Sequence, residues 1–155
     1  MRQRRVGIKS AGLAVLAAAV VVTVGIPAGY FLVVYGCGEK EDRLAAAIAG
    51  DPVLDAGPAG AGQGRPYKGC DDDDLWVYAG NSYSYGGSRE SALVHYRDAA
   101  QANGWRPRDS ASAASGSDCF TKRIGGTTAY LDVEDAGDGS VLVEIVADRT
   151  GSDWC

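Results

Sequence analysis

The sequence predicts an α+β protein with an N-terminal transmembrane helix followed by a two-layer domain, in which an antiparallel sheet carries one main helix on a face. Three observations support this fold class. Residues 11–35 contain no charged residue, and residues 88–103 place apolar side chains at helical spacing. Several short runs after residue 75 alternate as strands do, between glycine-containing turns. The resulting order, β-α-β-β-β-β, favours a sheet with a helix packed on one face.

The uncharged stretch is long enough to cross a bilayer. Its 25 positions would form about 37 Å of helix, against a hydrocarbon core of ~30 Å. Basic residues precede it, and a mixed-charge segment at 39–43 follows. Because positively charged flanks stay in the cytoplasm, we expect residues 1–10 to form a cytoplasmic tail and residues 11–35 a single span. The rest of the chain is then extracytoplasmic, and the protein belongs to the cell membrane. The basic residues of the tail are Arg2, Arg4, Arg5 and Lys9.

Two alternative fates of the N-terminus stay open. A signal peptidase could cleave after Ala28 in Ile26-Pro27-Ala28, because Gly25 and Pro27 end the first half of the apolar run. Alternatively, Cys37 could be lipidated, because residues 34–37 resemble a bacterial lipobox. The second alternative would make the protein a lipoprotein.

The charge distribution argues against a nucleic-acid partner. Four of the 15 Lys and Arg residues precede Ala11, and all 20 Asp and Glu residues follow Gly38. The chain after the uncharged stretch, residues 36–155, which we call the outer part, therefore has 11 basic and 20 acidic side chains, a formal charge of −9. Such a domain repels phosphate backbones.

A short helix and a linker are expected between the span and the domain. Glu39–Ala49 has acidic residues in its first turn and a glycine after its last, as helices often do. Asp55–Gly64 is rich in glycine and alanine, and it reads as a flexible tether without anchoring side chains. We therefore expect residues 36–66 to be a helix plus tether, and residues 67–155 to form the globular domain, beginning near Tyr67.

Inside the domain, one helix stands among strands. Ser88 is a good N-cap for a helix that runs to about Asn103. Gly125-Gly126 predicts a hairpin turn, and 135–139 predicts the next turn. A flexible loop is expected at 110–118. The expected strands are Leu75–Ala79 continued by 81–85, then Trp105–Asp109, Cys119–Ile124, Thr127–Glu134 and Ser140–Ala147.

A capped helix with a tyrosine near its middle ends in Gly-Trp at residues 88–105, and Cys-Phe-Thr-Lys follows at 119–122 before a final hairpin. In these features the chain resembles a group of uncharacterised small membrane-anchored or lipoprotein-like exported proteins of high-GC actinobacteria. The resemblance covers roughly residues 67–147. It implies an exported α+β domain, and because the group has no assigned activity it adds no catalytic residues.

Two features could carry chemistry, and each also has a structural interpretation. Asp71–Asp74 offers four adjacent carboxylates (Asp71, Asp72, Asp73 and Asp74), weak candidates for Ca²⁺ ligands that lack the spacing of an EF-hand loop. His95 is the single histidine, and it falls off the apolar stripe of its helix, so we expect it to be exposed. A hydrolase would need His95 to reach a nucleophile such as Ser91, whereas Ser88 and Ser91 suit helix capping. We expect no catalytic site, cofactor or metal.

Aromatic residues offer a possible binding surface. Trp76 and Tyr78 share one strand face by the two-residue period, and Tyr83 and Tyr85 share another. They could form a platform for a sugar or a peptide, or they could be core residues.

The four cysteines suit an oxidising compartment. Cys70 and Cys119 both adjoin predicted strands, and we expect them to form a disulfide. Cys37 and Cys155 could form the second pair, although sequence does not determine connectivity.

These features predict a non-enzymatic, membrane-anchored extracytoplasmic domain that binds an envelope protein or a cell-wall component. The alternatives are a lipoprotein or secreted envelope protein with a weak calcium- or glycan-binding role, and a small hydrolase.

Overall fold

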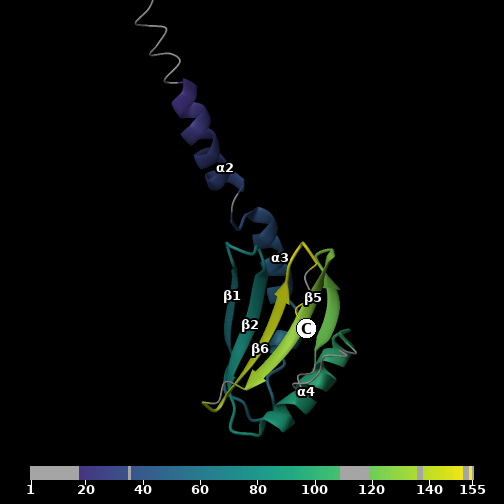
Figure 1. The fold of residues 1–155 in the computed structure, drawn as a ribbon. Coiled ribbons are helices and arrows are strands. Elements are labelled where there is room, and N and C mark those ends of the chain that lie inside the picture. The colour runs from purple at the N-terminus through teal and green to yellow at the C-terminus, as the bar shows by residue number, and fades with distance from the viewer. Residues whose placement is uncertain (1–17, 35, 109–118, 136–137, 152–153, 155) are drawn as a thin grey trace, which may run out of the picture. The chain divides into compact units, whose positions relative to one another are not determined.

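A computed structural model describes residues 18–34, 36–108, 119–135, 138–151 and 154. The chain divides into two compact units, Met1–Gly36 and Cys37–Cys155, and each is treated by itself (Figure 1).

The first unit is helical over residues 18–34. A π-helical segment, η1 (Val21–Gly25), leads into helix α2 (Ile26–Val34) just before Pro27, whose ring disturbs the carbonyls of the preceding turn. Val21, Val22 and Val24 are each more than half exposed. Among the described residues, no helix is both long and apolar enough to cross a membrane. Of the predicted segments, the tail 1–10 and, within the span, residues 11–17 and 35 lie outside the described residues.

The second unit is built on a six-stranded antiparallel sheet, which confirms the α+β class (Figure 1). Its spatial order is β1-β2-β6-β5-β4-β3. The strands are β1 (Arg65–Cys70), β2 (Val77–Ser84), β3 (Arg106–Pro107), β4 (Phe120–Ile124), β5 (Thr127–Asp135) and β6 (Ser140–Ala147). The helices are α3 (Glu39–Ala49), the 3-10 turn η2 (Pro52–Asp55) and α4 (Arg89–Ala102).

The core lies on one face of this sheet. In β6, every second side chain from Val141 to Ala147 is buried, and the alternate ones are half-buried. Two helices cover the buried face, because Ile48 of α3 and Tyr96 of α4 join the same apolar cluster as Ile145 of β6. The sequence predicted one main helix on the sheet, so the packing of α3 beside α4 on the buried face was not predicted.

Several elements match their predicted bounds. Helix α3 spans the predicted Glu39–Ala49, and β6 spans the predicted Ser140–Ala147. Ser88 caps α4 through a hydrogen bond that its hydroxyl accepts from the backbone N–H of Ser91. Gly125 and Gly126 both have positive φ, as the predicted two-residue hairpin turn requires.

The predicted domain boundary near Tyr67 is wrong, because the compact unit begins at Cys37. The predicted tether Asp55–Gly64 packs against Tyr83 of β2. A Cβ on Gly57 or Gly64 would lie 2.7 Å from Cε1 of that ring, so only glycine fits this close packing. The segment has no large side chains that could fix it in place, and instead the Tyr83 ring of β2 packs against its glycines.

The predicted Cys70–Cys119 disulfide is also wrong. Cys70 pairs with Cys37, with the two Cα atoms 6.1 Å apart. Cys70 ends β1 and Cys119 precedes β4, four strand spacings away in the sheet. At about 4.8 Å per spacing this is roughly 19 Å, far beyond the ~7 Å that a disulfide can bridge. The suggested Cys37–Cys155 pair is excluded by the same bond. Cys119 is disulfide-bonded too, and Cys155 lies outside the described residues.

A buried polar cluster ties the helices to the far strands. Asp51, which is 5% exposed, forms an ion pair with Lys122 of β4 at 2.7 Å. Its other oxygen accepts hydrogen bonds from the Trp105 indole and the Val53 backbone. Lys122 also donates to the carbonyl of Asn103 at the end of α4. Each charge is therefore compensated, as burial requires.

Candidate binding site on the open face of the sheet

The face of the sheet opposite the helices carries two adjacent rows of side chains. In the first row, Tyr78 of β2 pairs with Val146 of β6, and Val146 pairs with Tyr130 of β5. In the second row, Glu144 of β6 lies between Gly80 of β2 and Asp132 of β5. The register of the strands therefore places aromatic side chains next to acidic ones on this face.

The aromatic side chains continue beyond the first row. The Trp76 ring lies 5.1 Å from that of Tyr78 and 5.3 Å from that of Trp154, measured between centroids. Tyr67 of β1 extends the series, with its centroid 6.3 Å from Tyr78. Trp154 is held in place by a hydrogen bond from its indole to Asp148 at 3.3 Å. These contacts form one aromatic series, Tyr67–Tyr78–Trp76–Trp154, which we call the aromatic row.

Two glycines allow the tyrosines to lie across neighbouring strands. A Cβ on Gly80 would overlap the Tyr67 phenol, and a Cβ on Gly69 would overlap the Tyr78 phenol. Because Gly80 leaves this space, Tyr67 crosses β2 and donates a hydrogen bond to Glu144 Oε2 at 2.9 Å. The glycines thus connect edge strand β1 to the centre of the face.

Three carboxylates, Asp132, Glu134 and Glu144, form what we call the acidic row. Asp132 lies directly opposite Glu144, and Glu134 lies diagonally across from it. Burial raises the pKa of Glu144, and the charges of Glu134 and Asp132 raise it further against the opposing effect of the Tyr67 hydrogen bond. Burial, followed by the Glu144 charge, raises the pKa of Tyr67, so the phenol keeps its proton. Like charges placed opposite one another destabilise a sheet.

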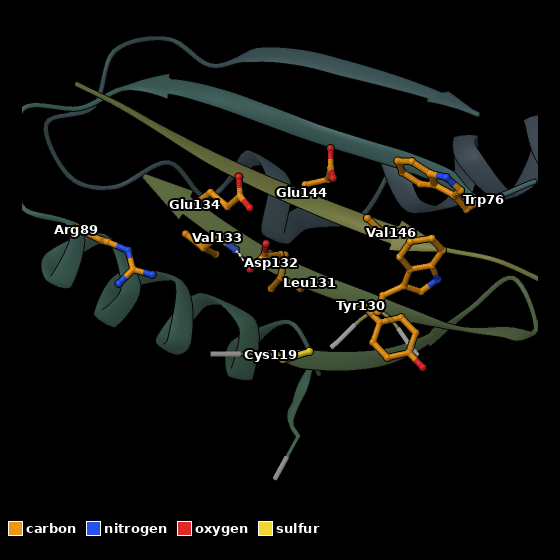
Figure 2. A pocket seen from close by; sticks show the side chains of 11 residues that line it. Trp76, Arg89, Cys119, Tyr130, Leu131, Asp132, Val133, Glu134, Glu144 and Val146 are labelled. Carbon is orange, nitrogen blue, oxygen red and sulfur yellow. Dashed lines mark hydrogen bonds between the residues drawn. The ribbon is translucent and has the colours of Figure 1, made fainter. Parts of the chain in front are cut away.

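Trp76 and Trp154 of the aromatic row, together with Tyr130 and the acidic row, line a pocket of about 520 Å³ (Figure 2). Trp76 and Tyr130 lie toward one end (Figure 2), and Trp154 lies beside Trp76. The acidic row lies beside them on β5 and β6. Arg89 of α4 lies at the opposite end from Trp76 (Figure 2). Pockets of this size, lined by aromatic groups with a few polar ones, are typical of ligand sites.

The predicted calcium candidates Asp71–Asp74 lie in the turn between β1 and β2. Asp71 accepts hydrogen bonds from the backbone N–H groups of Asp73 and Asp74, and Asp72 accepts one from the backbone of Cys37. In the part of the chain that the structure describes, no group of three or more His, Cys, Asp or Glu side chains is placed to hold a metal ion. The carboxylates of Asp71 and Asp72 organise the turn.

His95 is half-buried, which corrects the expectation of an exposed side chain. Its Nε2 lies 2.8 Å from the carbonyl oxygen of Ala56 and donates to it as an N–H. Ser91 instead contacts Ser88 and the Tyr85 hydroxyl. No described hydrogen bond joins His95 to Ser91, so the geometry assembles no base and nucleophile there.

The predicted aromatic platform is divided between the two faces of the sheet. Trp76 and Tyr78 share the open face, as expected, whereas Tyr83 is buried on the core face. Sequence reasoning missed Tyr67, Tyr130 and Trp154. Alternation in β5 could have placed Tyr130, but the pairing of β1 with β2 had no local signal.

The fold and this face define the class: an α+β domain with a two-helix layer on one side of an antiparallel sheet and an aromatic–acidic pocket on the other. Beyond that class, the chain matches no protein-family model, no curated protein and no solved structure.

Proposed function

We propose that the protein is a non-enzymatic binding domain, anchored in the cell membrane and extracytoplasmic, that holds an envelope protein on the open face of its sheet. The observation that carries this proposal is the pocket of about 520 Å³ between the aromatic and acidic rows. A sheet face without a function at this position has no need of three mutually repelling carboxylates beside Trp76, Trp154 and Tyr130.

The first unit supports the membrane anchor. Its residues 18–34 are helical, and the large apolar side chains described between Val20 and Tyr30 are exposed to more than half of their surface. The transfer of such side chains from water into hydrocarbon is favourable. Disulfides support an oxidising compartment outside the cytoplasm.

The Cys37–Cys70 bond argues against the lipoprotein alternative. Lipidation would attach a thioether to the Cys37 sulfur, and that sulfur is bonded to Cys70. The bond is compatible with an uncleaved helical anchor and with cleavage after Ala28, because both leave Cys37 in the chain.

The binding proposal is tested by photo-crosslinking of the full chain in membranes. Benzoylphenylalanine replaces Tyr78 on the open face and, as a control, Gln101, which is exposed on α4. We expect a discrete adduct with an envelope protein from position 78 and none from position 101. Equal adducts from both positions, or none from position 78, would refute the proposal.

The anchor is tested separately by washing the membranes at alkaline pH and measuring the intact mass of the retained protein. A chain that begins at Gly29 would show cleavage instead. Release of the full-length chain by the wash would refute the anchor.

A further inference from the structure

We propose that the pocket on the open face binds a basic segment of the partner protein and receives one of its arginine or lysine side chains. This inference rests on the proposed function and names the chemistry that the site recognises.

The first argument is charge. Asp132, Glu134 and Glu144 share one face, and none of them forms an ion pair within the described part of the chain. Asp132 accepts a hydrogen bond from the neighbouring Val133 N–H, and Glu144 accepts one from Tyr67. Neither bond neutralises a charge. A cation placed between these carboxylates would remove the repulsion between Glu144 of β6 and the two acids of β5.

The second argument is the aromatic wall. A cation within about 6 Å of an aromatic centroid is attracted to the face of the ring, most strongly for tryptophan and more often for arginine than lysine. The molecule already uses this contact on the same face, where Arg108 Cζ lies 5.9 Å from the Tyr130 centroid. Trp76 and Trp154 offer two indoles at the same pocket. Carboxylates beside indoles are complementary to a guanidinium, which combines positive charge with a flat surface.

The third argument is the environment of Glu144. Burial and the charges of Glu134 and Asp132 raise its pKa, and the hydrogen bond from Tyr67 offsets this only in part. The titratable and charged groups that face it are Tyr67 of β1 and the two acids of β5, and Arg89 of α4 lines the same pocket. Tyr67 is a neutral donor, so an incoming cation finds an ionisable acceptor whose charge is uncompensated.

A basic partner also fits the charge of the whole outer part. Its formal charge of −9 would attract a basic segment over the distance set by ionic screening and accelerate its encounter. A neutral glycan could stack on the same rings, but it would leave the acidic row unpaired. The observations therefore favour the peptide.

The test uses the full chain in detergent micelles and fluorescence anisotropy at low salt. The probe is a short labelled peptide of arginine, glycine and serine, and its control replaces each arginine by citrulline, which keeps the shape and removes the charge. We expect the arginine peptide to bind at least about tenfold more tightly. We also expect its affinity to fall as salt increases.

Matched variants locate the site. Glu144→Gln and Trp154→Ala should each weaken binding of the arginine peptide by about fivefold to tenfold. Asp98→Asn, which removes the same charge as Glu144→Gln from the exposed surface of α4, should leave the affinity unchanged. Thermal unfolding of each variant confirms that it is folded.

The outcomes separate this inference from the proposed function. Equal binding of the citrulline peptide, or equal losses from Asp98→Asn and Glu144→Gln, would overturn the cation inference. Binding of a neutral oligosaccharide in place of the peptide would also overturn it, whereas an adduct from position 78 would still support the binding face. Loss of both peptide binding and the adduct would refute both.

Discussion

Breaking the Cys37–Cys70 disulfide should destabilise the second unit strongly. The two cysteines are 33 residues apart, and the chain-entropy model gives about 3.7 kcal/mol for closing a loop of that length. That is a large part of the 5–15 kcal/mol that is typical of a domain. For a unit of about 120 residues it corresponds to a fall in melting temperature of about 15 °C.

The assay compares Cys37→Ser, Cys70→Ser and the double variant by thermal unfolding. All three should lose about the same stability, because each opens the same loop and a second substitution has no bond left to break. Peptide mapping without reduction should recover Cys37 linked to Cys70. A peptide linking Cys70 to Cys119, or a loss below about 1 kcal/mol in the double variant, would refute the reasoning.

Three further predictions concern the domain boundary, the glycine segment and the acidic row. Ile48→Ala should cost about 2–5 kcal/mol because the side chain is fully buried, whereas Val94→Ala, at a site 49% exposed, should cost less than about 0.5 kcal/mol; similar melting temperatures for the two variants would place α3 outside the domain. Gly57→Ala should destabilise by about 1–3 kcal/mol through overlap with a buried tyrosine ring, and Gly86→Ala, which has open space around it, should be neutral; equal melting temperatures would contradict this packing. Because the folded state raises the pKa of Glu144, its contribution to stability is full below the unfolded value near 4.5 and is lost as the pH rises through the folded pKa. Glu144→Gln should therefore match the wild type near pH 4 and melt at a higher temperature at pH 7, and a variant that is less stable at pH 7 would oppose this sign.

The Glu144 prediction links stability to function. A carboxylate that lowers the stability of the free domain at neutral pH, and whose replacement weakens peptide binding, shows the stability cost that binding sites often carry. Measurement of both properties on the same variant distinguishes a binding residue from a packing residue.

Local signals were enough for the elements that form within a short stretch of chain. Ser88 capped α4 as predicted, since a hydroxyl at that position satisfies a backbone N–H of the first turn. Gly125-Gly126 predicted its hairpin because two positive φ angles are needed there. The alternation of Ser140–Ala147 predicted a strand with one buried face. In each case the residues that determine the structure are neighbours in sequence.

The tertiary structure alone decided how distant segments meet. Edge strand β1 contains Pro66 and Gly69, which weaken a strand signal and are tolerated because one side of the strand is unpaired. The glycine-rich segment before it is held by Tyr83 of β2, and Cys70 finds Cys37 because β1 lies beside α3. The candidate pocket likewise needs the register of β2, β6 and β5 together with Trp154. The sequence determined which residues lie on each face of a strand, whereas only the order of the strands brought the aromatic and acidic rows together.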